Sequence, residues 1–403
     1  MIDNKEKKKV VQINTVCTGS TGNIMQQIQV AANEKGYETI SFYGRRKGYE
    51  TLKCEKFGNM FSFWTHVIWT TLTDMQGCLS VFHTKKMIKR LKEEKPDIIH
   101  LHNLHGYYLN YPILFKYLKK DFKGKIVWTF HDCWPMTGHC PYFIMVQCEK
   151  WKTMCHHCPN KKKYPISWFK DSSRHNYKEK RRMFTGLDNM IIVCPSQWLS
   201  NIVQESFFVG NQIEVIPNGI DFELFSPREE NTTIQRYKIP KDKKIILGVA
   251  NIWEERKGLN VFCELAKRLD EKYIIVLVGL NDKQIRSLPS NIIGIKRTEN
   301  QIELSQIYSK ATVFMNPSKE ETFSLVTVEA MACGTPVIVL DNSAVKELVN
   351  EKTGIVLHNP TMDDYLVTIK LMEDSNYNKF EIRKYAEKFS NKNMQEKYME
   401  IYR

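Results

Sequence analysis

The sequence predicts an α/β protein with two doubly wound domains, each built on a mostly parallel sheet covered by helices. Its 403 residues, of which 42% are hydrophobic, supply enough apolar material for two cores. Short apolar runs alternate with helical patterns along the whole chain, and this alternation is typical of βαβ units. The apolar runs are nearly continuous, which indicates parallel strands buried on both faces.

The expected strands follow one another along both halves of the chain. The first half has five such runs, at Val10–Val16, Thr39–Tyr43, Ile98–Leu101, Ile126–Phe130 and Met190–Cys194. The second half also has five, at Ile245–Ala250, Ile274–Val278, Ile292–Ile295, Thr312–Met315 and Val337–Leu340. Helices are expected at Met87–Glu94, Leu259–Leu269 and Val328–Cys333, and over the C-terminal segment Phe380–Arg403.

Turn-forming and polar residues interrupt this series between residues 210 and 240. We therefore expect a first domain at residues 1–215, which contains a cysteine-rich insert at 133–160, and a second domain at residues 216–385. A C-terminal helix at residues 386–403 is expected to pack back on the first domain. The natural arrangement of two such domains is one in which they face a central cleft.

Positive charge is concentrated in the first half of the chain. The net charge is +14, and residues 1–194 contain 32 Lys and Arg against 16 Asp and Glu. This excess has two readings: a solvated surface, or a face turned toward an anionic partner such as phosphate, nucleic acid or acidic lipid. Composition alone does not choose between them.

The longest apolar stretch, Met60–Leu72, is shorter than the roughly 18–20 residues of a membrane span. The first residues do not have the pattern of a signal peptide, so we expect a cytoplasmic protein. The aromatic residues of this stretch include Phe61, Trp64 and Trp69, and basic residues follow at 85–90. They predict either a core helix or a patch that faces an anionic membrane surface.

The most specific motif is a pair of glutamates, Glu321 and Glu329, that follows the strand expected at Thr312–Met315. A turn at Thr322–Ser324 would lead into a helix that carries Glu329. Free N–H groups at a helix start can hold phosphate oxygens, and a carboxylate can accept two hydrogen bonds from paired sugar hydroxyls. Parallel sheets bind ligands at the carboxyl ends of their strands. The alternative is two solvated surface glutamates.

With this motif the sequence resembles the retaining nucleotide-sugar glycosyltransferases of family 4, which have the GT-B fold of two Rossmann-like domains facing a cleft. The resemblance covers essentially the whole chain and is most specific over residues 311–340. It implies that Glu321 bonds the donor sugar in the catalytic site and that Glu329 bonds the ribose. The backbone expected to meet the pyrophosphate is that of Phe323, Ser324 and Leu325.

A second match follows the strand at Ile245–Ala250. The family places an arginine just after this strand and a lysine before a glycine, and both bind the pyrophosphate. Lys257 fits this pattern, Asn251 stands at the arginine position, and Arg256 offers a substitute cation. Such cations stabilise the departing diphosphate, so no catalytic metal is expected. A solvated charge run at a helix start is the alternative.

In the first domain the glycine-containing loop at residues 18–23 follows the first strand. The resemblance implies that Gly19, Gly22 and Asn23 line the cleft near the reacting groups. The spacing is not that of a dinucleotide site. His131 ends another strand, and its family counterpart contacts the donor sugar or positions the acceptor. A hydrogen-bonded structural histidine is the alternative.

Five of the eleven cysteines lie within residues 133–158. In a cytosolic chain such a cluster indicates metal binding before disulfides. Four of them can supply the thiolates of a tetrahedral structural zinc site: Cys140, Cys148, Cys155 and Cys158. Reduced core cysteines are the alternative. A zinc ion would order a loop too polar to fold alone.

Taken together, these features predict a retaining glycosyltransferase that moves a sugar from a nucleotide diphosphate sugar to a saccharide acceptor. The acceptor is expected to be lipid-linked and bound by the first domain. The pathway is expected to be a bacterial surface polysaccharide, such as capsule, exopolysaccharide or lipopolysaccharide, with the enzyme peripheral on the inner membrane face. The alternatives are a GT-B nucleotide-sugar epimerase and a zinc-containing nucleic-acid-binding protein. The second alternative leaves the glutamate pair unexplained, so nucleic acid is not an expected partner.

Overall fold

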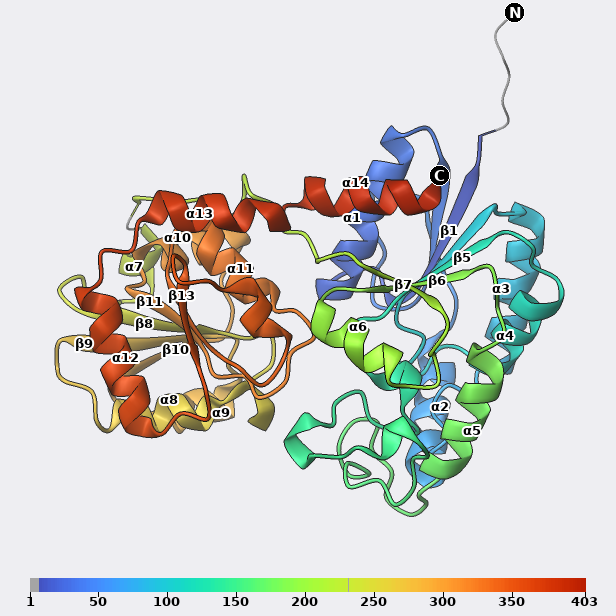
Figure 1. The fold of residues 1–403 in the computed structure, drawn as a ribbon, viewed down its shortest axis with the longest axis horizontal. Helices are drawn as coiled ribbons and strands as arrows, with labels where there is room; N and C mark the ends of the chain where they lie inside the picture. Colours follow the sequence, from blue (N-terminus) through green and yellow to red (C-terminus); the bar gives the residue numbers. More distant parts are fainter. Residues whose placement is uncertain (1–6, 231) are drawn as a thin grey trace, which may run out of the picture. The chain divides into compact units, whose positions relative to one another are not determined.

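The computed structural model describes residues 7–230 and 232–403, and the chain divides into two compact units (Figure 1). The first unit consists of residues 1–217 together with 395–403, and the second consists of residues 218–394. Each unit is built on one parallel sheet whose strands are joined by helices. The two-sheet α/β architecture expected from the sequence is confirmed.

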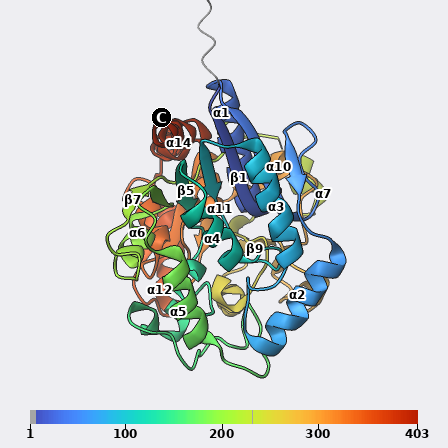
Figure 2. The ribbon, with the colours of Figure 1, turned by 90° about the vertical axis from the view of Figure 1, so that its right-hand side faces the viewer.

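The first unit contains a seven-stranded sheet in the order β3-β2-β1-β4-β5-β6-β7. Its strands are β1 (Lys9–Val16), β2 (Glu38–Arg45), β3 (Cys54–Lys56), β4 (Ile98–Leu101), β5 (Lys125–Thr129), β6 (Met190–Cys194) and β7 (Gln212–Val215). Its helices are α1 (Ser20–Glu34), α2 (Met60–Thr73), α3 (Val81–Glu94), α4 (Tyr111–Lys120), α5 (Ser173–Phe184), α6 (Gln197–Gln204) and α14 (Asn391–Tyr402). Figure 2 shows α3, α4 and α5 in succession over this unit, with α2 at its margin.

The second unit contains a six-stranded sheet in the order β10-β9-β8-β11-β12-β13. Its strands are β8 (Lys244–Val249), β9 (Tyr273–Val278), β10 (Ile292–Ile295), β11 (Val313–Asn316), β12 (Val337–Leu340) and β13 (Gly354–Leu357). Its helices are α7 (Thr232–Arg236), α8 (Leu259–Ala266), α9 (Asp282–Arg286), α10 (Gln301–Lys310), α11 (Leu325–Ala332), α12 (Met362–Asp374) and α13 (Lys379–Ala386).

Continuous apolar runs form the central strands because both faces of these strands are covered. Every residue of β9 and β12 is buried, as are six of the eight residues of β1. The edge strand β7 shows the opposite pattern, since its polar residues Gln212 and Glu214 are exposed. This strand was not expected from the sequence, because half of its side chains are polar and lie on the solvent side.

The strand order reverses between β1 and β4 in the first unit and between β8 and β11 in the second. At such a reversal the connections leave toward opposite faces and open a crevice at the carboxyl ends of the strands. The loops that follow β1 and β4 lie at this edge of the first sheet. The loops that follow β8 and β11 lie at the corresponding edge of the second.

The pattern over Phe380–Arg403 indicated helix along the whole C-terminal segment. The structure has two separate helices there instead. These are α13 and α14, separated by a short 3₁₀ turn at Glu387–Phe389 and an extended residue, Ser390. Ser390 pairs with Ile220 in a parallel bridge, and this pairing interrupts the helical hydrogen bonds. The chain changes direction at this interruption, and α14 then packs on the first unit.

Buried hydrogen bonds attach α14 to the first sheet. The Tyr402 hydroxyl lies 2.6 Å from His100 Nδ1, and the Tyr398 hydroxyl lies 2.9 Å from Thr129 Oγ1. His100 Nε2 also contacts Thr129 Oγ1, at 2.8 Å. Because all of these side chains are buried, α14 is an integral layer of the first unit rather than a loose tail.

Candidate functional site

The turn between β11 and α11 is fixed by three polar side chains. The Asn316 amide donates to Ser324 Oγ and to Thr327 Oγ1, each at 3.0 Å, and the two hydroxyls lie 2.9 Å apart. Ser324 stands directly before the helix with φ 110°. Since its hydroxyl bonds to these side chains, the first backbone N–H groups of α11 remain directed toward the carboxyl edge of the sheet. That arrangement suits a phosphate group.

The loop after β8 meets the loop after β11 at Lys257 and Glu321. Lys257 Nζ forms an ion pair with Glu321 Oε1, and Arg256 Nη1 lies 3.9 Å from Glu321 Oε2. Arg256 also donates to the Glu320 carbonyl, at 3.0 Å. Burial alone would raise the pKa of the Glu321 carboxyl, but Lys257 and then Arg256 outweigh it, so this pKa lies below its ordinary value.

Gly258 permits the close approach of these two loops. It follows Lys257 with φ 77°, and a Cβ at this position would lie 2.8 Å from the Pro317 carbonyl oxygen. An L-residue here would be strained and would also push the loops apart. The glycine therefore sets the distance between the cations and Glu321.

Glu329 lies in the second turn of α11 and accepts a hydrogen bond from the Tyr308 hydroxyl, at 3.0 Å. Burial raises the pKa of its carboxyl to about 7, and the hydrogen bond from Tyr308 offsets only part of this increase. Unlike Glu321, Glu329 has no cation among the groups that shift its pKa. The two glutamates thus differ in protonation near neutral pH because only one of them faces Lys257 and Arg256.

The other predicted donor residues have different surroundings. Asn251 is exposed in the turn after β8. The Phe323 ring is buried 5.7 Å from the Phe389 ring, centroid to centroid. Phe323 can therefore offer a ligand only its backbone. Leu325 is partly buried against the same core.

The glycine loop after β1 leads directly into α1. A Cβ on Gly22 would lie 2.4 Å from the Cys17 carbonyl carbon, so only glycine fits there. Gly19 has φ 86°, and its carbonyl accepts a hydrogen bond from the Asn23 N–H at 2.7 Å. A Cβ on Gly19 would meet the Arg46 guanidinium at 3.2 Å. Sequence reasoning missed Arg46, whose only signal was its place just after the second expected strand.

His131 directly follows Phe130 after β5 and belongs to a buried chain of polar side chains. His131 Nε2 lies 3.1 Å from His102 Nδ1, and His102 Nε2 lies 3.1 Å from Gln12 Oε1. Burial lowers the pKa of His131 to about 4, and burial together with His100 holds the pKa of His102 well below its ordinary value. Both rings are therefore neutral near pH 7.

The hydrogen bonds of Gln12 determine which nitrogen of each ring carries the proton. The Gln12 amide nitrogen donates to the Met25 carbonyl, at 3.0 Å, so its oxygen faces His102. His102 Nε2 must then be the donor, and its Nδ1 is the acceptor. His131 accordingly carries its proton on Nε2 and donates it to His102. Neither Gln12 nor the role of His102 was predicted from the sequence.

A second ion pair lies beside this chain. His105 Nε2 lies 2.8 Å from Asp132 Oδ2, and the Trp134 N–H donates to Asp132 Oδ1 at 2.9 Å. Burial alone would raise the pKa of Asp132, but His105 outweighs it and the pKa is lowered. The negative charge of Asp132 is thus fixed one residue after His131.

Four of the five cysteines of the insert, those predicted to bind zinc, line one small cavity together with His139. The hydrogen bond between Cys140 and Cys158 raises the pKa of the Cys140 thiol and lowers that of Cys158 to about 7. Across residues 7–230 and 232–403, no group of three or more His, Cys, Asp or Glu side chains has the arrangement that holds a metal ion. The structural zinc site therefore stays a prediction.

Comparison with known proteins agrees with this geometry. Residues 34–224 match the family described as Glycosyltransferase Family 4, and residues 229–393 match Glycosyl transferases group 1. A putative colanic acid biosynthesis glycosyl transferase, WcaC of Escherichia coli K12, is 23% identical over 64% of this chain and 63% of its own length. An uncharacterized protein in the cps region of Klebsiella pneumoniae is 25% identical over 79% of this chain and 81% of its own. This chain thus spans less than two thirds of WcaC.

Solved structures show the same fold at low sequence identity. Sucrose-phosphate synthase from Thermosynechococcus elongatus superposes with a TM-score of 0.73 at 16% identity, covering 98% of both chains. Anabaena HepE in complex with UDP-glucose superposes with a TM-score of 0.66 at 14% identity, covering 98% of this chain and 99% of its own. The solved structures show that the fold is GT-B. Because the two family matches together span both units, the chain belongs to the family 4 glycosyltransferases.

Proposed function

We propose that this protein is a retaining glycosyltransferase that uses a nucleotide diphosphate sugar as donor and a saccharide as acceptor. The observation that carries this proposal is the site at the start of α11. There the Lys257–Glu321 ion pair, Arg256 and the N-terminal N–H groups of the helix meet at the carboxyl edge of the second sheet. Cations and helix N–H groups fit a diphosphate, and the carboxylate fits sugar hydroxyls.

Each group at this site has a chemical task in the proposed reaction. The helix N–H groups and Lys257 would stabilise the negative charge that develops on the departing diphosphate. Glu321, kept ionised by the same lysine, would accept hydrogen bonds from the donor sugar. Glu329 would bond the ribose hydroxyls from the helix itself. The relative HepE has been solved with UDP-glucose, and this supports a nucleotide sugar as the donor.

We propose that the reaction retains the anomeric configuration, because this is the mechanism of the family that the chain resembles. In such a mechanism the leaving phosphate guides the incoming hydroxyl on the same face of the sugar, so no covalent intermediate is required. The chain's contribution is positioning and charge stabilisation. His131, neutral and with its proton fixed on Nε2, is proposed to orient a reactant through hydrogen bonds rather than to act as a strong base.

The proposed acceptor is a lipid-linked saccharide at the inner face of the cytoplasmic membrane, in the assembly of a surface polysaccharide. Two relatives support the pathway, one named for colanic acid biosynthesis and one from a cps region. None of the helices in residues 7–230 and 232–403 combines the length and apolar character needed to cross a bilayer. Any association with the membrane is therefore proposed to be peripheral.

The proposal is tested by thermal-shift binding against UDP-, GDP-, ADP- and CMP-sugars without added metal. We expect one nucleotide class to raise the melting temperature, because a ligand that binds only the folded state stabilises it. Glu329→Ala should abolish this shift, whereas Glu351→Ala, at an exposed site of the same unit, should leave it unchanged. A folded protein that responds to no donor would contradict the proposal. Donor turnover without any acceptor would favour an epimerase.

A further inference from the structure

Helix α2 is attached to the first unit by its polar side. Its two buried side chains are His66 and Thr70. His66 Nδ1 lies 2.9 Å from Ser80 Oγ, and the Gly77 N–H donates to His66 Nε2 at 3.1 Å. Burial lowers the pKa of His66 to about 4, so the ring is neutral in this polar contact. A helix of a water-exposed domain ordinarily buries its apolar side instead.

The apolar side of α2 points away from the protein. Phe61, Trp64, Ile68 and Leu72 follow one another at intervals of three or four residues, which places them on one helix face. Their exposed fractions are 79%, 55%, 57% and 46%. His66 and Thr70 lie on the opposite face. An exposed apolar stripe of this length marks a surface that binds a partner, either another protein or a membrane.

Two further segments extend this stripe. At the start of α3, Phe82 is 75% exposed, and the neighbouring Ser80 hydroxyl lies 3.4 Å from Ser62 of α2. In the loop before α5, the Trp168 N–H donates to the Thr71 carbonyl at 3.0 Å. We call the combined surface the α2 apolar surface and define it by its exposed side chains: Met60, Phe61, Trp64, Ile68, Trp69, Leu72, Val81, Phe82, Ile166, Trp168 and Phe169.

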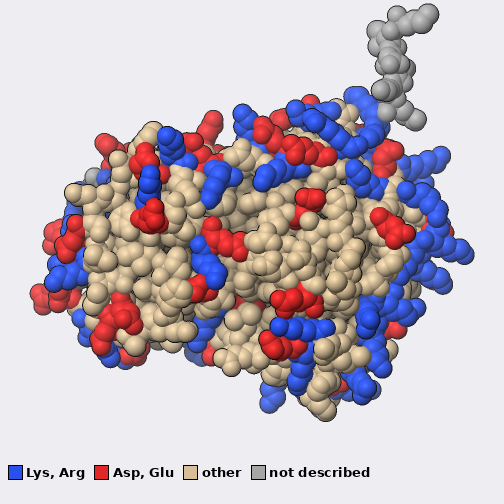
Figure 3. Space-filling model, viewed as in Figure 1, with Lys and Arg blue, Asp and Glu red and all other residues tan. Residues whose placement is uncertain are grey.

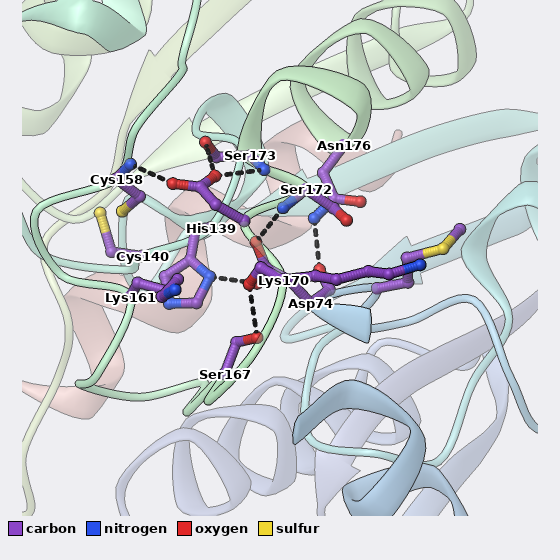
Figure 4. A network of polar contacts seen from close by, with 12 residues as sticks. Asp74, His139, Cys140, Cys158, Lys161, Ser167, Lys170, Ser172, Ser173 and Asn176 are labelled. Carbon is purple, nitrogen blue, oxygen red and sulfur yellow. Dashed lines mark hydrogen bonds and ion pairs between the residues drawn. The ribbon is translucent and has the colours of Figure 1, made fainter. Parts of the chain in front are cut away.

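A buried polar network fixes the loop that carries Trp168 and Phe169 to the end of α2 (Figure 4). Asp74 Oδ2 accepts a hydrogen bond from the Ser172 N–H at 2.8 Å, and the Asp74 carbonyl accepts one from Asn176 at 2.5 Å. The Ser172 hydroxyl donates to the Thr73 carbonyl at 2.7 Å. His139 forms an ion pair with the same aspartate. The two apolar segments are therefore held side by side before any partner arrives.

The two segments that carry the α2 apolar surface are basic and contain no exposed acidic residue. In the first of these segments, between Glu55 and Glu93, the sequence contains one acidic residue, Asp74, and this residue is buried. The stretch between Glu149 and Asp171 contains none. The exposed lysines in and beside these segments include Lys85, Lys86, Lys162, Lys163 and Lys170. Figure 3 shows Lys and Arg crowding the margin of this unit, where α3 and α4 lie.

We propose that the α2 apolar surface docks on an anionic phospholipid bilayer. The aromatic and aliphatic side chains enter the boundary between headgroups and acyl chains, where tryptophan is favoured. The flanking lysines remain at the headgroups and attract their negative charge. A second protein chain fits less well as the occupant, because lysine is depleted from protein–protein interfaces whereas it surrounds this surface.

This docking gives the proposed lipid-linked acceptor its route to the first unit, and to that extent it rests on the proposed function. The binding itself needs neither donor nor acceptor. Vesicle binding and donor binding can therefore fail independently. A protein that binds vesicles but no nucleotide sugar would keep the docking surface and remove the proposed donor.

The test is flotation of the full chain with vesicles of phosphatidylcholine alone or with about 30% phosphatidylglycerol. The native protein should float with the anionic vesicles. Phe61→Ser/Trp64→Ser should lower the bound fraction about tenfold, since two interfacial anchors are lost. The matched control, Val367→Ser/Leu371→Ser, removes two exposed apolar residues from α12 of the second unit and should bind as the native protein does.

A second pair of variants tests the charge. Lys85→Glu/Lys86→Glu should lower binding to anionic vesicles about tenfold or more, whereas Lys241→Glu/Lys352→Glu makes the same change of charge on the second unit and should have little effect. Failure of the native protein to float, or equal losses in target and control variants, would overturn the proposal. So would a native dimer in light scattering that Phe61→Ser/Trp64→Ser converts to monomer, because a second copy would then be the partner.

Discussion

Glu329 holds its proton at a pH where an exposed glutamate has lost it. The cause is local, because burial is opposed only by the hydrogen bond from Tyr308 and by no cation. Glu321, eight residues earlier, lies against Lys257 and stays ionised. The two glutamates of one motif thus reach opposite charge states because their neighbouring side chains differ. Spacing in the sequence predicted the pair but could not show which member faces the cations.

Glu329→Gln should make the ligand-free protein more stable above neutral pH. The pKa of Glu329 is about 7 in the folded chain against a reference value of 4.5. Between these values the unfolded chain binds fewer protons than the folded chain, so stability falls as pH rises. The amide removes this loss, and we expect a gain of about 1–3 kcal/mol at pH 8.

Chemical denaturation at two pH values checks this expectation. Near pH 4.5 the native protein and Glu329→Gln should unfold at similar denaturant concentrations, because both side chains are then neutral. Equal stability at pH 8 would show that the carboxyl titrates normally. Glu321→Gln provides the contrast, since its loss leaves Lys257 unpaired and should destabilise the protein at both pH values.

The tautomer of His131 should depend on Gln12, two side chains away. Gln12→Leu removes the acceptor that fixes the proton on His102 Nε2. The proton of His102 can then move to Nδ1, where it blocks the hydrogen bond from His131. We expect kcat to fall about tenfold, with Gln12→Glu retaining more activity because an acceptor oxygen is kept. Binding of the nucleoside diphosphate alone should not change. A fall in that affinity matching the fall in kcat would indicate general loss of structure instead.

At the scale of elements, the sequence predicted well wherever burial dictated the residue pattern. All ten expected strands are present, because most of their residues are apolar and buried. The strands β3, β7 and β13 were missed, and β3 and β7 lie at the edges of the first sheet, where polar side chains obscure the pattern. The core-helix reading of Met60–Leu72 is wrong, because the large apolar side chains of α2 are exposed and its buried side chains are His66 and Thr70. No periodicity reveals that a helix is attached by its polar face.

Gly258→Ala should separate the loops after β8 and β11. The substitution combines left-handed backbone strain with a clash against Pro317, and we expect a loss of stability of about 1–3 kcal/mol together with loss of donor binding. Gly186→Ala is a matched control, because Gly186 has φ 74° but no atom within 4 Å of its Cβ position. Thermal melts with and without donor separate the two effects. If both variants behave alike, strain alone explains the change.

For the cysteine-rich insert, the zinc site that the sequence predicts still has to be tested by experiment. The four thiols of this predicted site share a cavity, and the only regular elements of the insert are short 3₁₀ turns at Trp134–Met136, Ile144–Val146 and Lys150–Lys152. If the predicted zinc is present, elemental analysis of purified protein should find about one zinc ion per chain, and a chelator should lower the melting temperature. Cys155→Ser should lose the metal, whereas Cys263→Ser, in α8, should keep it. Metal-free, fully stable protein would favour reduced core cysteines.

At the scale of the whole molecule, the second unit is inserted into the first. The chain leaves the first unit after Pro217 and returns at Gln395. The two ends of the insertion lie together, since the Ile220 N–H donates to the Phe389 carbonyl at 3.0 Å and the Asn391 N–H donates to the Ile220 carbonyl at 2.8 Å. A repeat of two similar α/β units was predictable from the strand pattern. The return of the last helix depends on buried polar contacts that no pattern indicates.

The contacts of α14 predict how the first unit responds to small changes near the C-terminus. Tyr402→Phe leaves His100 Nδ1 without its buried hydroxyl partner, and we expect a loss of about 1–2 kcal/mol. Tyr385→Phe, on α13 of the second unit, removes a hydroxyl that makes no hydrogen bond within residues 7–230 and 232–403, and it should cost less than about 0.5 kcal/mol. Equilibrium unfolding measures both. A larger effect of Tyr385→Phe would place the sensitive contact in the second unit.

The late return of α14 has a consequence for synthesis on the ribosome. Residues 218–394 can close their own sheet once they emerge, because both of their ends are held by backbone pairing within that unit. The first unit, although made earlier, lacks Tyr398 and Tyr402 until residues 218–394 have been translated. The surface of β4 and β5 that carries His100 and Thr129 therefore stays uncovered while residues 218–394 are added. The first unit is thus completed by a segment that is translated after the whole of the second unit.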